Sequence, residues 1–250
     1  MLLLLRGMKA LKRYKYHLLA ALILMGLLLA GAKTKMGTVT KTADELPHVG
    51  SAFQMNHALE LFPSRKAGLA LDVGATGDLR GLILDLVKKS LPTRFEEKAF
   101  EIARAVIVEA NDNNMDPLFL LAVITTESRF NLDARGTHGE IGLMQVLPVT
   151  AKWLASQAGL PAKFDLRDPA VNIRVGAHYL AKLRHTFNHK GTRYIAAYNM
   201  GVTNVFRLLR SNTEPTEYAS RVLGNYSQIY NVVSGRIAQN SASRGLASVE

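Results

Sequence analysis

An uncharged, mostly apolar run from Leu118 to Thr126 constrains this chain more than any other segment. Asp116-Pro117 precedes the run, and Asp as the N-cap with Pro in the first turn is a typical start of an α-helix. We therefore predict a helix that ends close to Glu127-Ser128. A carboxylate at that end either points into water or is held against apolar neighbours with a raised pKa. The second state is the one that a general acid needs near neutral pH.

The rest of the chain also shows helical patterns. Apolar residues recur at helical spacing between Phe95 and Ala110. Asp168-Pro169 repeats the Asp-Pro start and predicts a helix to about Phe187. Further helices are predicted at Pro148–Gln157, Thr192–Asn199, Val202–Arg210 and Pro215–Val233. No segment predicts a strand, so the predicted fold class is all-α.

A chain of 250 residues has room for one or two domains. We divide it into an N-terminal export segment, a linker, a helical lead-in whose role the sequence does not indicate, the main helical domain and a disordered Ser/Ala-rich tail. Their predicted bounds are 1–32, 33–50, 51–94, 95–234 and 235–250, respectively.

The N-terminus has the pattern of an export signal. The basic residues up to Lys15 are followed by an apolar run from Leu18 to Ala30 of about 13 residues and by the small residues Ala30-Gly31-Ala32. This predicts an exported protein of the periplasm or cell envelope. An uncleaved membrane anchor is the alternative, because Tyr16–Ala32, at about 17 residues, reaches the lower limit for a membrane span. Met1 and Met8 both remain candidate start sites.

Composition excludes several classes of site. The chain has no cysteine, which excludes disulfides, thiolate metal sites and a lipid-modified N-terminal cysteine. His185 and His189 share a helical spacing but have no accompanying carboxylate ligand, so we predict no metal and no cofactor. The net charge of +11 attracts polyanions, yet no nucleic-acid-binding motif accompanies it, and nucleic acid is not an expected partner.

Two short motifs follow Glu127-Ser128: Gly142-Leu143-Met144-Gln145 and Ala197-Tyr198-Asn199. In this order the three elements resemble the catalytic domain of the soluble lytic transglycosylase family, and the resemblance extends from about Asp116 to about Tyr230. It implies a lysozyme-like helical domain with a substrate cleft. It also implies a lyase that cleaves the bond between N-acetylmuramic acid and N-acetylglucosamine in peptidoglycan and leaves 1,6-anhydro ends.

The resemblance also implies roles for individual residues. Glu127 is the expected catalytic residue, acting first as acid and then as base, and the Tyr198 phenol is expected to bond its carboxyl group. Met144 offers a soft apolar surface to a sugar, and Gln145 offers both a donor and an acceptor. The expected substrate-binding residues are Ser128, Met144, Gln145, Tyr198, Asn199 and Tyr218. For Ser128 the alternative is a hydroxyl that bonds its own helix.

The sequence departs from the family pattern at several positions. Thr137 and Glu140 replace the usual Ser and Ala, and Pro215-Thr216 precede Tyr218 in place of the usual residues. Glu140 and Asp133 are the candidates near Glu127 for a second carboxylate.

We expect Trp153 to lie in the core rather than to stack on a sugar. A hydrolase similar to goose-type lysozyme and a non-catalytic wall-binding or secretion-assembly component are the alternative functions.

Overall fold

The computed structural model describes residues 41–62 and 79–247. Thr42–Glu250 form one compact unit, and the preceding unit, Met1–Lys41, lies almost wholly outside the described residues. The predicted export segment therefore lies outside them as well. None of the helices in the described ranges has the length and apolar character needed to span a membrane.

Helices account for the described structure. Before the main domain lie the short 3-10 helix η1 (Ala43–Glu45), α2 (Ser51–Leu61) and α3 (Leu79–Ser90). The main domain contains η3 (Thr93–Lys98), α4 (Ala99–Asp112), α5 (Pro117–Ser128), α6 (Pro148–Leu154), α7 (Pro169–Thr186), α8 (Gly191–Met200), α9 (Val202–Arg210) and α10 (Glu217–Ala247). Within the described ranges the extended pairing is limited to isolated bridges that join Arg135 to Ile141 and Ile141 to Val146. The all-α prediction is confirmed.

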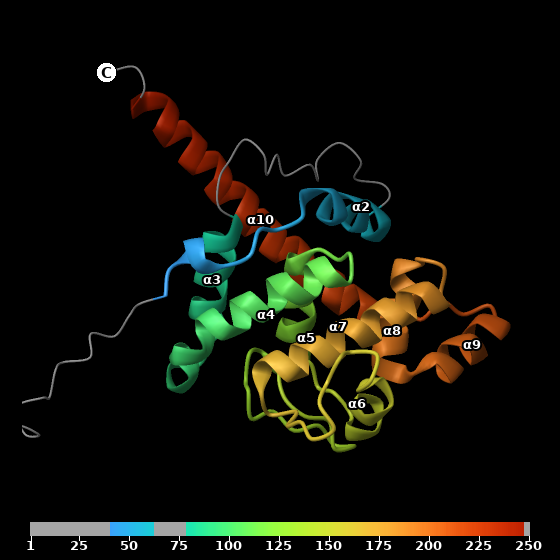
Figure 1. Cartoon of the computed structure of the whole chain (residues 1–250). Coiled ribbons are helices and arrows are strands. Elements are labelled where there is room, and N and C mark those ends of the chain that lie inside the picture. The colour runs from blue at the N-terminus through green and yellow to red at the C-terminus, as the bar shows by residue number, and fades with distance from the viewer. Residues whose placement is uncertain (1–40, 63–78, 248–250) are drawn as a thin grey trace, which may run out of the picture. The chain divides into compact units, whose positions relative to one another are not determined.

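Helix α5 lies at the centre of the packing (Figure 1). Its residues Pro117 to Ile124 are all buried, and it packs against α4 and α10. Helix α7 packs against α4, α6 and α8, and α8 also contacts α9, α10 and α2. Burial on every side of α5 leaves only its last turn, which contains Glu127, near the surface.

The start of α5 is fixed by a buried polar network. Asp116 accepts a hydrogen bond from the Leu118 N–H at 2.8 Å and one from the Tyr226 hydroxyl at 2.5 Å. The Asp116 N–H donates to His57 Nδ1 at 3.2 Å, so Nε2 is the protonated nitrogen and lies 2.9 Å from the Tyr194 hydroxyl. His57 comes from α2, and burial lowers its pKa. Helix α2 of the predicted lead-in thus completes the core beneath α5, a role that the sequence did not indicate.

Two predicted boundaries are wrong. The tail from residue 235 was expected to be disordered, but α10 continues to Ala247. Tyr230, Val233 and Ile237 form a buried stripe at helical spacing that anchors the helix as far as residue 237. The linker was expected to reach residue 50, but the compact unit begins at Thr42, and Leu46 is buried in it.

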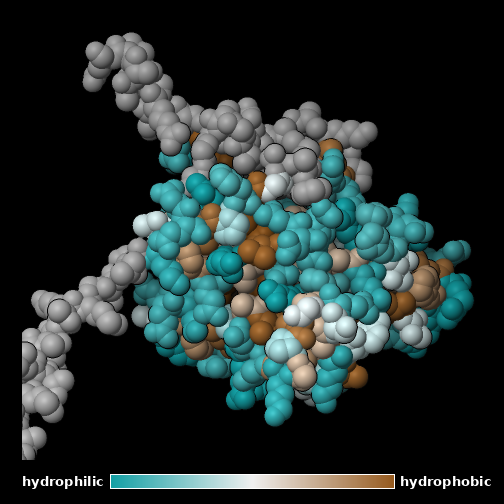
Figure 2. Space-filling view, in the orientation of Figure 1, coloured by the Kyte–Doolittle hydropathy of each residue, from teal (hydrophilic) through white to brown (hydrophobic). Residues whose placement is uncertain are grey.

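On the face shown in Figure 2 most of the described surface is hydrophilic. Hydrophobic side chains form separate small areas, one of them over α9, where Phe206 is exposed.

Candidate active site

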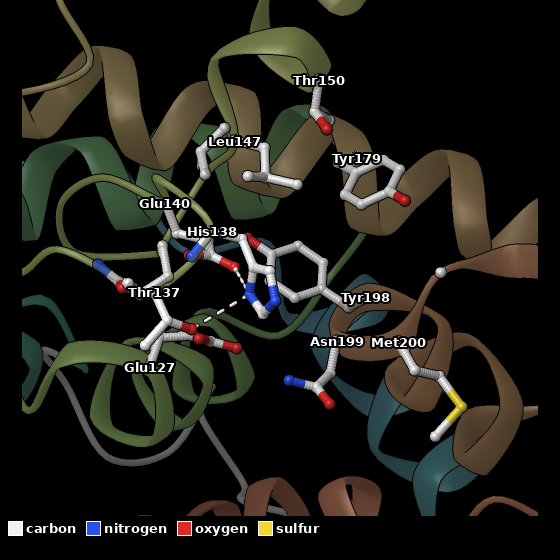
Figure 3. A pocket seen from close by; sticks show the side chains of 14 residues that line it. Glu127, Thr137, His138, Glu140, Leu147, Thr150, Tyr179, Tyr198, Asn199 and Met200 are labelled. Atoms are coloured by element: carbon white, nitrogen blue, oxygen red, sulfur yellow. Dashed lines mark hydrogen bonds and ion pairs between the residues drawn. The ribbon is translucent and has the colours of Figure 1, made fainter. Parts of the chain in front are cut away.

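A cleft of about 480 Å³ opens beside the last turn of α5. Its walls come from α5, from the loop between α5 and α6, and from α6, α7 and α8 (Figure 3). The lining residues are Glu127, Gly136, Thr137, His138, Glu140, Gln145, Val146, Leu147, Thr150, Tyr179, Tyr198, Asn199, Met200 and Gly201. Four of the predicted site residues therefore meet in one hollow: Glu127, Gln145, Tyr198 and Asn199.

Glu127 is half-buried, and its carboxyl group is held by a phenol of α10. The Tyr218 hydroxyl donates to Glu127 Oε1. Our expectation that Tyr198 makes this bond is wrong, because the Tyr198 hydroxyl donates instead to the Met144 carbonyl at 2.8 Å. Tyr218 is buried and does not line the cleft, so it positions Glu127 from behind.

The surroundings of Glu127 favour its protonated form. Burial is the main cause and raises the pKa of the carboxyl group. The Tyr218 hydrogen bond and the charge of Arg221 lower it, and the charge of Glu140 raises it further. Burial together with the charge of Glu127 also raises the pKa of Tyr218 well above its usual value, so this phenol remains a hydrogen-bond donor. The net effect on Glu127 is the one that a general acid requires.

The Gly142–Gln145 motif forms a turn that is fixed to α7 by Asn172. The buried Asn172 amide accepts from the Met144 N–H at 2.8 Å and donates to the Ile141 and Leu166 carbonyls at 2.8 and 2.9 Å. Gly142 has φ +76°, and a Cβ there would lie 2.7 Å from Asn172 Nδ2. Glycine is therefore required at this position for both conformation and space.

The Met144 side chain does not face the cleft, contrary to the expectation of an apolar surface for a sugar. It is 0% exposed and packs against α7 at Gly176, where an added Cβ would lie 2.5 Å from its Sδ atom. The Met144 backbone carbonyl holds Tyr198 at the edge of the cleft. Gln145 does line the cleft, in the left-handed conformation, with Nε2 donating to the Gly142 carbonyl at 2.8 Å.

Three further predictions concern residues outside the cleft lining. The Ser128 hydroxyl donates to the Ile124 carbonyl at 3.2 Å, which is the alternative role considered for it. Trp153 is 53% exposed, so the prediction of a core position is wrong. Its ring instead packs edge-on against Tyr179, with the Lys182 ammonium over its face. Asp133 pairs with Arg94 at the surface.

Glu140 differs from Asp133 because it lines the same cleft as Glu127 (Figure 3). Its carboxylate accepts from the His138 N–H at 2.9 Å and lies 3.3 Å from His138 Nδ1. Gly136 leaves the space for this arrangement, since a Cβ there would lie 2.1 Å from Glu140 Oε2. Hydrogen bonds from its own backbone N–H and from His138 lower the pKa of Glu140. The cleft thus contains one carboxyl group that favours its proton and one that favours its charge.

Sequence reasoning missed several residues that build the site. Asn172 and Gly176 lie in the first half of α7 and belong to no motif, so their contact with the Gly142–Gln145 turn had no sequence signal. Tyr179 and His138 also line the cleft without having been predicted. Within the described residues no cluster of three or more His, Cys, Asp and Glu side chains could hold a metal ion.

Comparison with known proteins supports the resemblance derived from the motifs. Residues 104–220 match the sequence model of the family described as "Transglycosylase SLT domain". Two relatives are named "Membrane-bound lytic murein transglycosylase C". The one from Mannheimia succiniciproducens is 35% identical over 132 residues, covering 48% of this chain and 36% of the relative. The one from Edwardsiella ictaluri is 31% identical over 147 residues, covering 52% and 40%. The chain thus spans well under half the length of these relatives.

Two solved structures are similar in arrangement. The lytic transglycosylase Slt from Pseudomonas aeruginosa has 23% identity and a TM-score of 0.47, covering 78% of this chain and 38% of that one. The 70 kDa soluble lytic transglycosylase SLT70 from Escherichia coli has 22% identity and a TM-score of 0.48, covering 63% and 27%.

Proposed function

Because residues 104–220 match the model of the SLT transglycosylase domain, we propose that this protein is a peptidoglycan lytic transglycosylase. The observation that carries the proposal is Glu127, half-buried in a cleft, with a raised pKa and a phenol that fixes its carboxyl group. The names of the relatives, lytic murein transglycosylase, agree with this activity.

In the proposed reaction, protonated Glu127 donates its proton to the glycosidic oxygen between N-acetylmuramic acid and N-acetylglucosamine. The C1–O bond breaks, and the N-acetylglucosamine side leaves as an alcohol. The acetamido oxygen of the muramic acid closes on C1 and replaces a second protein carboxylate. Glu127, now ionised, accepts the proton of the 6-hydroxyl as that oxygen attacks C1. The bond between C1 and the acetamido oxygen breaks in the same step, which restores the acetamido group, forms the 1,6-anhydro ring and returns Glu127 to its protonated form. Gln145 and Asn199 line the cleft and supply hydrogen-bond partners for the acetamido and hydroxyl groups.

We further propose that the protein is exported and works in the cell envelope. The basic and apolar pattern of residues 1–32 supports export, and the word "membrane-bound" in the names of the relatives agrees with an envelope location. N-terminal sequencing of the protein from separated membrane, periplasmic and cytoplasmic fractions tests this proposal. A mature N-terminus at Lys33 indicates cleavage, an intact apolar segment indicates an anchor, and an intact soluble cytoplasmic protein contradicts both.

Mass analysis of products from purified peptidoglycan tests the activity. The proposal predicts muropeptides with 1,6-anhydro ends, each lighter by one water than the corresponding hydrolysis product. Products with only reducing ends would contradict it.

Glu140 favours a second candidate function. Two carboxyl groups in one cleft, one with a raised pKa and one with a lowered pKa, form the arrangement that many glycoside hydrolases use. If the chain were a hydrolase similar to goose-type lysozyme, reducing ends would dominate and Glu140→Gln would abolish cleavage. Under the transglycosylase proposal, Glu140→Gln retains most cleavage and the anhydro products.

A further inference from the structure

A second hollow lies on another face of the end of α5. It is a surface groove of about 650 Å³ between the end of α5, the end of α3 and the first turns of α10. Two guanidinium groups line it, Arg129 just after α5 and Arg221 on α10. Among residues 41–62 and 79–247, no aspartate or glutamate contributes to its lining, which therefore has a positive charge.

The two arginines are available for a ligand. Both are exposed, and neither forms an ion pair with a carboxylate of the described residues. Arg221 lies over the ring of Tyr218 with its guanidinium carbon 5.5 Å from the ring centroid, which limits its conformational freedom. Hydroxyl and amide groups that can donate hydrogen bonds surround the pair: Ser90, Ser220, Asn225 and Gln228.

The floor of the groove is held in place by contacts between its helices. Asn225 of α10 donates to the Thr126 hydroxyl oxygen at 2.9 Å, and that hydroxyl donates to the Ala122 carbonyl at 2.8 Å. The groove therefore combines a fixed floor, two planar guanidinium groups and neutral hydrogen-bond donors. Guanidinium groups can bind a carboxylate through two parallel hydrogen bonds, so the groove suits a ligand that carries carboxylates.

We propose that this groove binds carboxylates of the peptide stem that the glycan strand carries. The inference rests on the proposed function, because a strand in the cleft presents its muramic acid, with the stem attached, beside Glu127. Arg221 connects the two places: its guanidinium lies over Tyr218, whose hydroxyl bonds Glu127. The stem is rich in carboxylates, which the positive charge of the groove complements.

A binding experiment with the full-length Glu127→Gln protein tests the inference without cleavage of the ligand. The probes are a glycan tetrasaccharide with tripeptide stems and the same tetrasaccharide with its stem carboxylates amidated. Exposed charge pairs contribute up to about 1 kcal/mol each, so the acidic probe should bind about 5- to 10-fold more tightly at low salt. Adding Arg129→Gln or Arg221→Gln should remove most of that preference, and adding Arg210→Gln, a control on α9, should leave it unchanged.

The outcomes separate the groove from the cleft. Equal binding of the two probes, or a preference that survives in both the Arg129→Gln and Arg221→Gln proteins, overturns the groove while the proposed function stands. Failure of the amidated probe to bind at all contradicts the proposed function itself and removes the basis of the inference. Because Glu127 is replaced throughout, any effect of Arg221 on the pKa of that residue cannot produce the result.

Discussion

The cleft and the groove use different faces of the same helix end and present different ionisable groups. Glu127 and Glu140 line the cleft, whereas Arg129 and Arg221 line the groove. The cleft depends on buried contacts between elements of the fold. Asn172 and Gly176 of α7 fix the turn that forms one of its walls. The groove consists largely of exposed side chains on helix ends. The first region has the features of a site for chemistry, and the second has those of a site for binding.

This difference follows from the chemistry of the two charged groups. Burial disfavours the charged form of a carboxyl group, so the raised pKa of Glu127 depends mainly on the surrounding apolar core. A guanidinium group remains charged in water at any relevant pH and needs no burial to recognise an anion. The end of α5 can therefore carry a carboxyl group with a raised pKa on its buried face and an anion-binding guanidinium group on its solvent-exposed face.

The largest expected effect distinguishes the two regions directly. Glu127→Gln should reduce glycan cleavage by about 10³- to 10⁴-fold, because an amide cannot deliver and retrieve a proton. Arg129→Gln, a substitution on the groove side of the same helix end, should leave cleavage of a peptide-free strand within about 5-fold, since an exposed charge contributes at most about 1 kcal/mol. Initial rates on peptide-free strands measure both. Comparable losses in the two variants would show that the regions are not separate.

Because buried contacts hold the wall of the cleft, a substitution in this wall should strongly reduce the free energy of unfolding. Gly142→Ala forces a left-handed residue to carry a Cβ that lies 2.7 Å from Asn172, and we expect a loss of about 2–4 kcal/mol in the free energy of unfolding. Gly139→Ala is the matched control, because Gly139 has φ +88° but open space around it, so it should cost only about 1–2 kcal/mol of backbone strain. Urea denaturation measures both. Equal losses would mean that the contact with Asn172 adds nothing.

The sequence predicted most of the fold because its helices carry local signals. The Asp-Pro starts at Asp116 and Asp168 both cap helices, and the second accepts from the Ala170 and Val171 N–H groups as predicted. Val202–Arg210 is a helix with the predicted bounds. The continuation of α10 was missed because its stripe of Tyr230, Val233 and Ile237 is sparse and follows a Ser/Ala-rich composition.

The sequence predicted several of the residues that line the candidate site, but it did not predict the contacts that these residues make. The motifs brought Glu127, Gln145, Tyr198 and Asn199 to one cleft. They did not reveal that the Met144 side chain points away from it, since that depends on the space left by Gly176 in another helix. The groove had no motif at all, because Arg129 and Arg221 are brought together only by the packing of α5 on α10.

Tyr218→Phe tests the contact that sequence reasoning assigned to Tyr198. Loss of a hydrogen bond to a carboxyl group that can carry charge should reduce cleavage by about 10- to 100-fold, from a bond worth about 1.5–3 kcal/mol. Tyr198→Phe removes a bond to the Met144 carbonyl instead and should cost less. Steady-state rates and thermal unfolding of both variants separate positioning from stability. A smaller loss for Tyr218→Phe than for Tyr198→Phe would contradict the positioning role of Tyr218.

The smallest predicted effect is a shift in the pH dependence of cleavage, caused by one charged residue from the groove and one from the cleft. Cleavage requires the protonated form, so activity should fall as pH rises through the pKa of Glu127. Burial is the main cause of the raised pKa, the positive charge of Arg221 lowers it, and the negative charge of Glu140 raises it. Arg221→Gln should therefore move the alkaline limb of the kcat/KM profile to higher pH, and Glu140→Gln should move it to lower pH.

The two pH shifts should also differ in size and in their response to salt. Arg221 has the larger influence of the two charges, so its removal should produce the larger displacement. Both shifts should shrink at high ionic strength, because these charges lie near solvent. Arg210→Gln on α9 serves as the control and should leave the limb in place. Profiles measured on peptide-free strands keep binding of the stem out of the comparison. Shifts in the same direction for Arg221→Gln and Glu140→Gln would show that the limb reports a group other than Glu127.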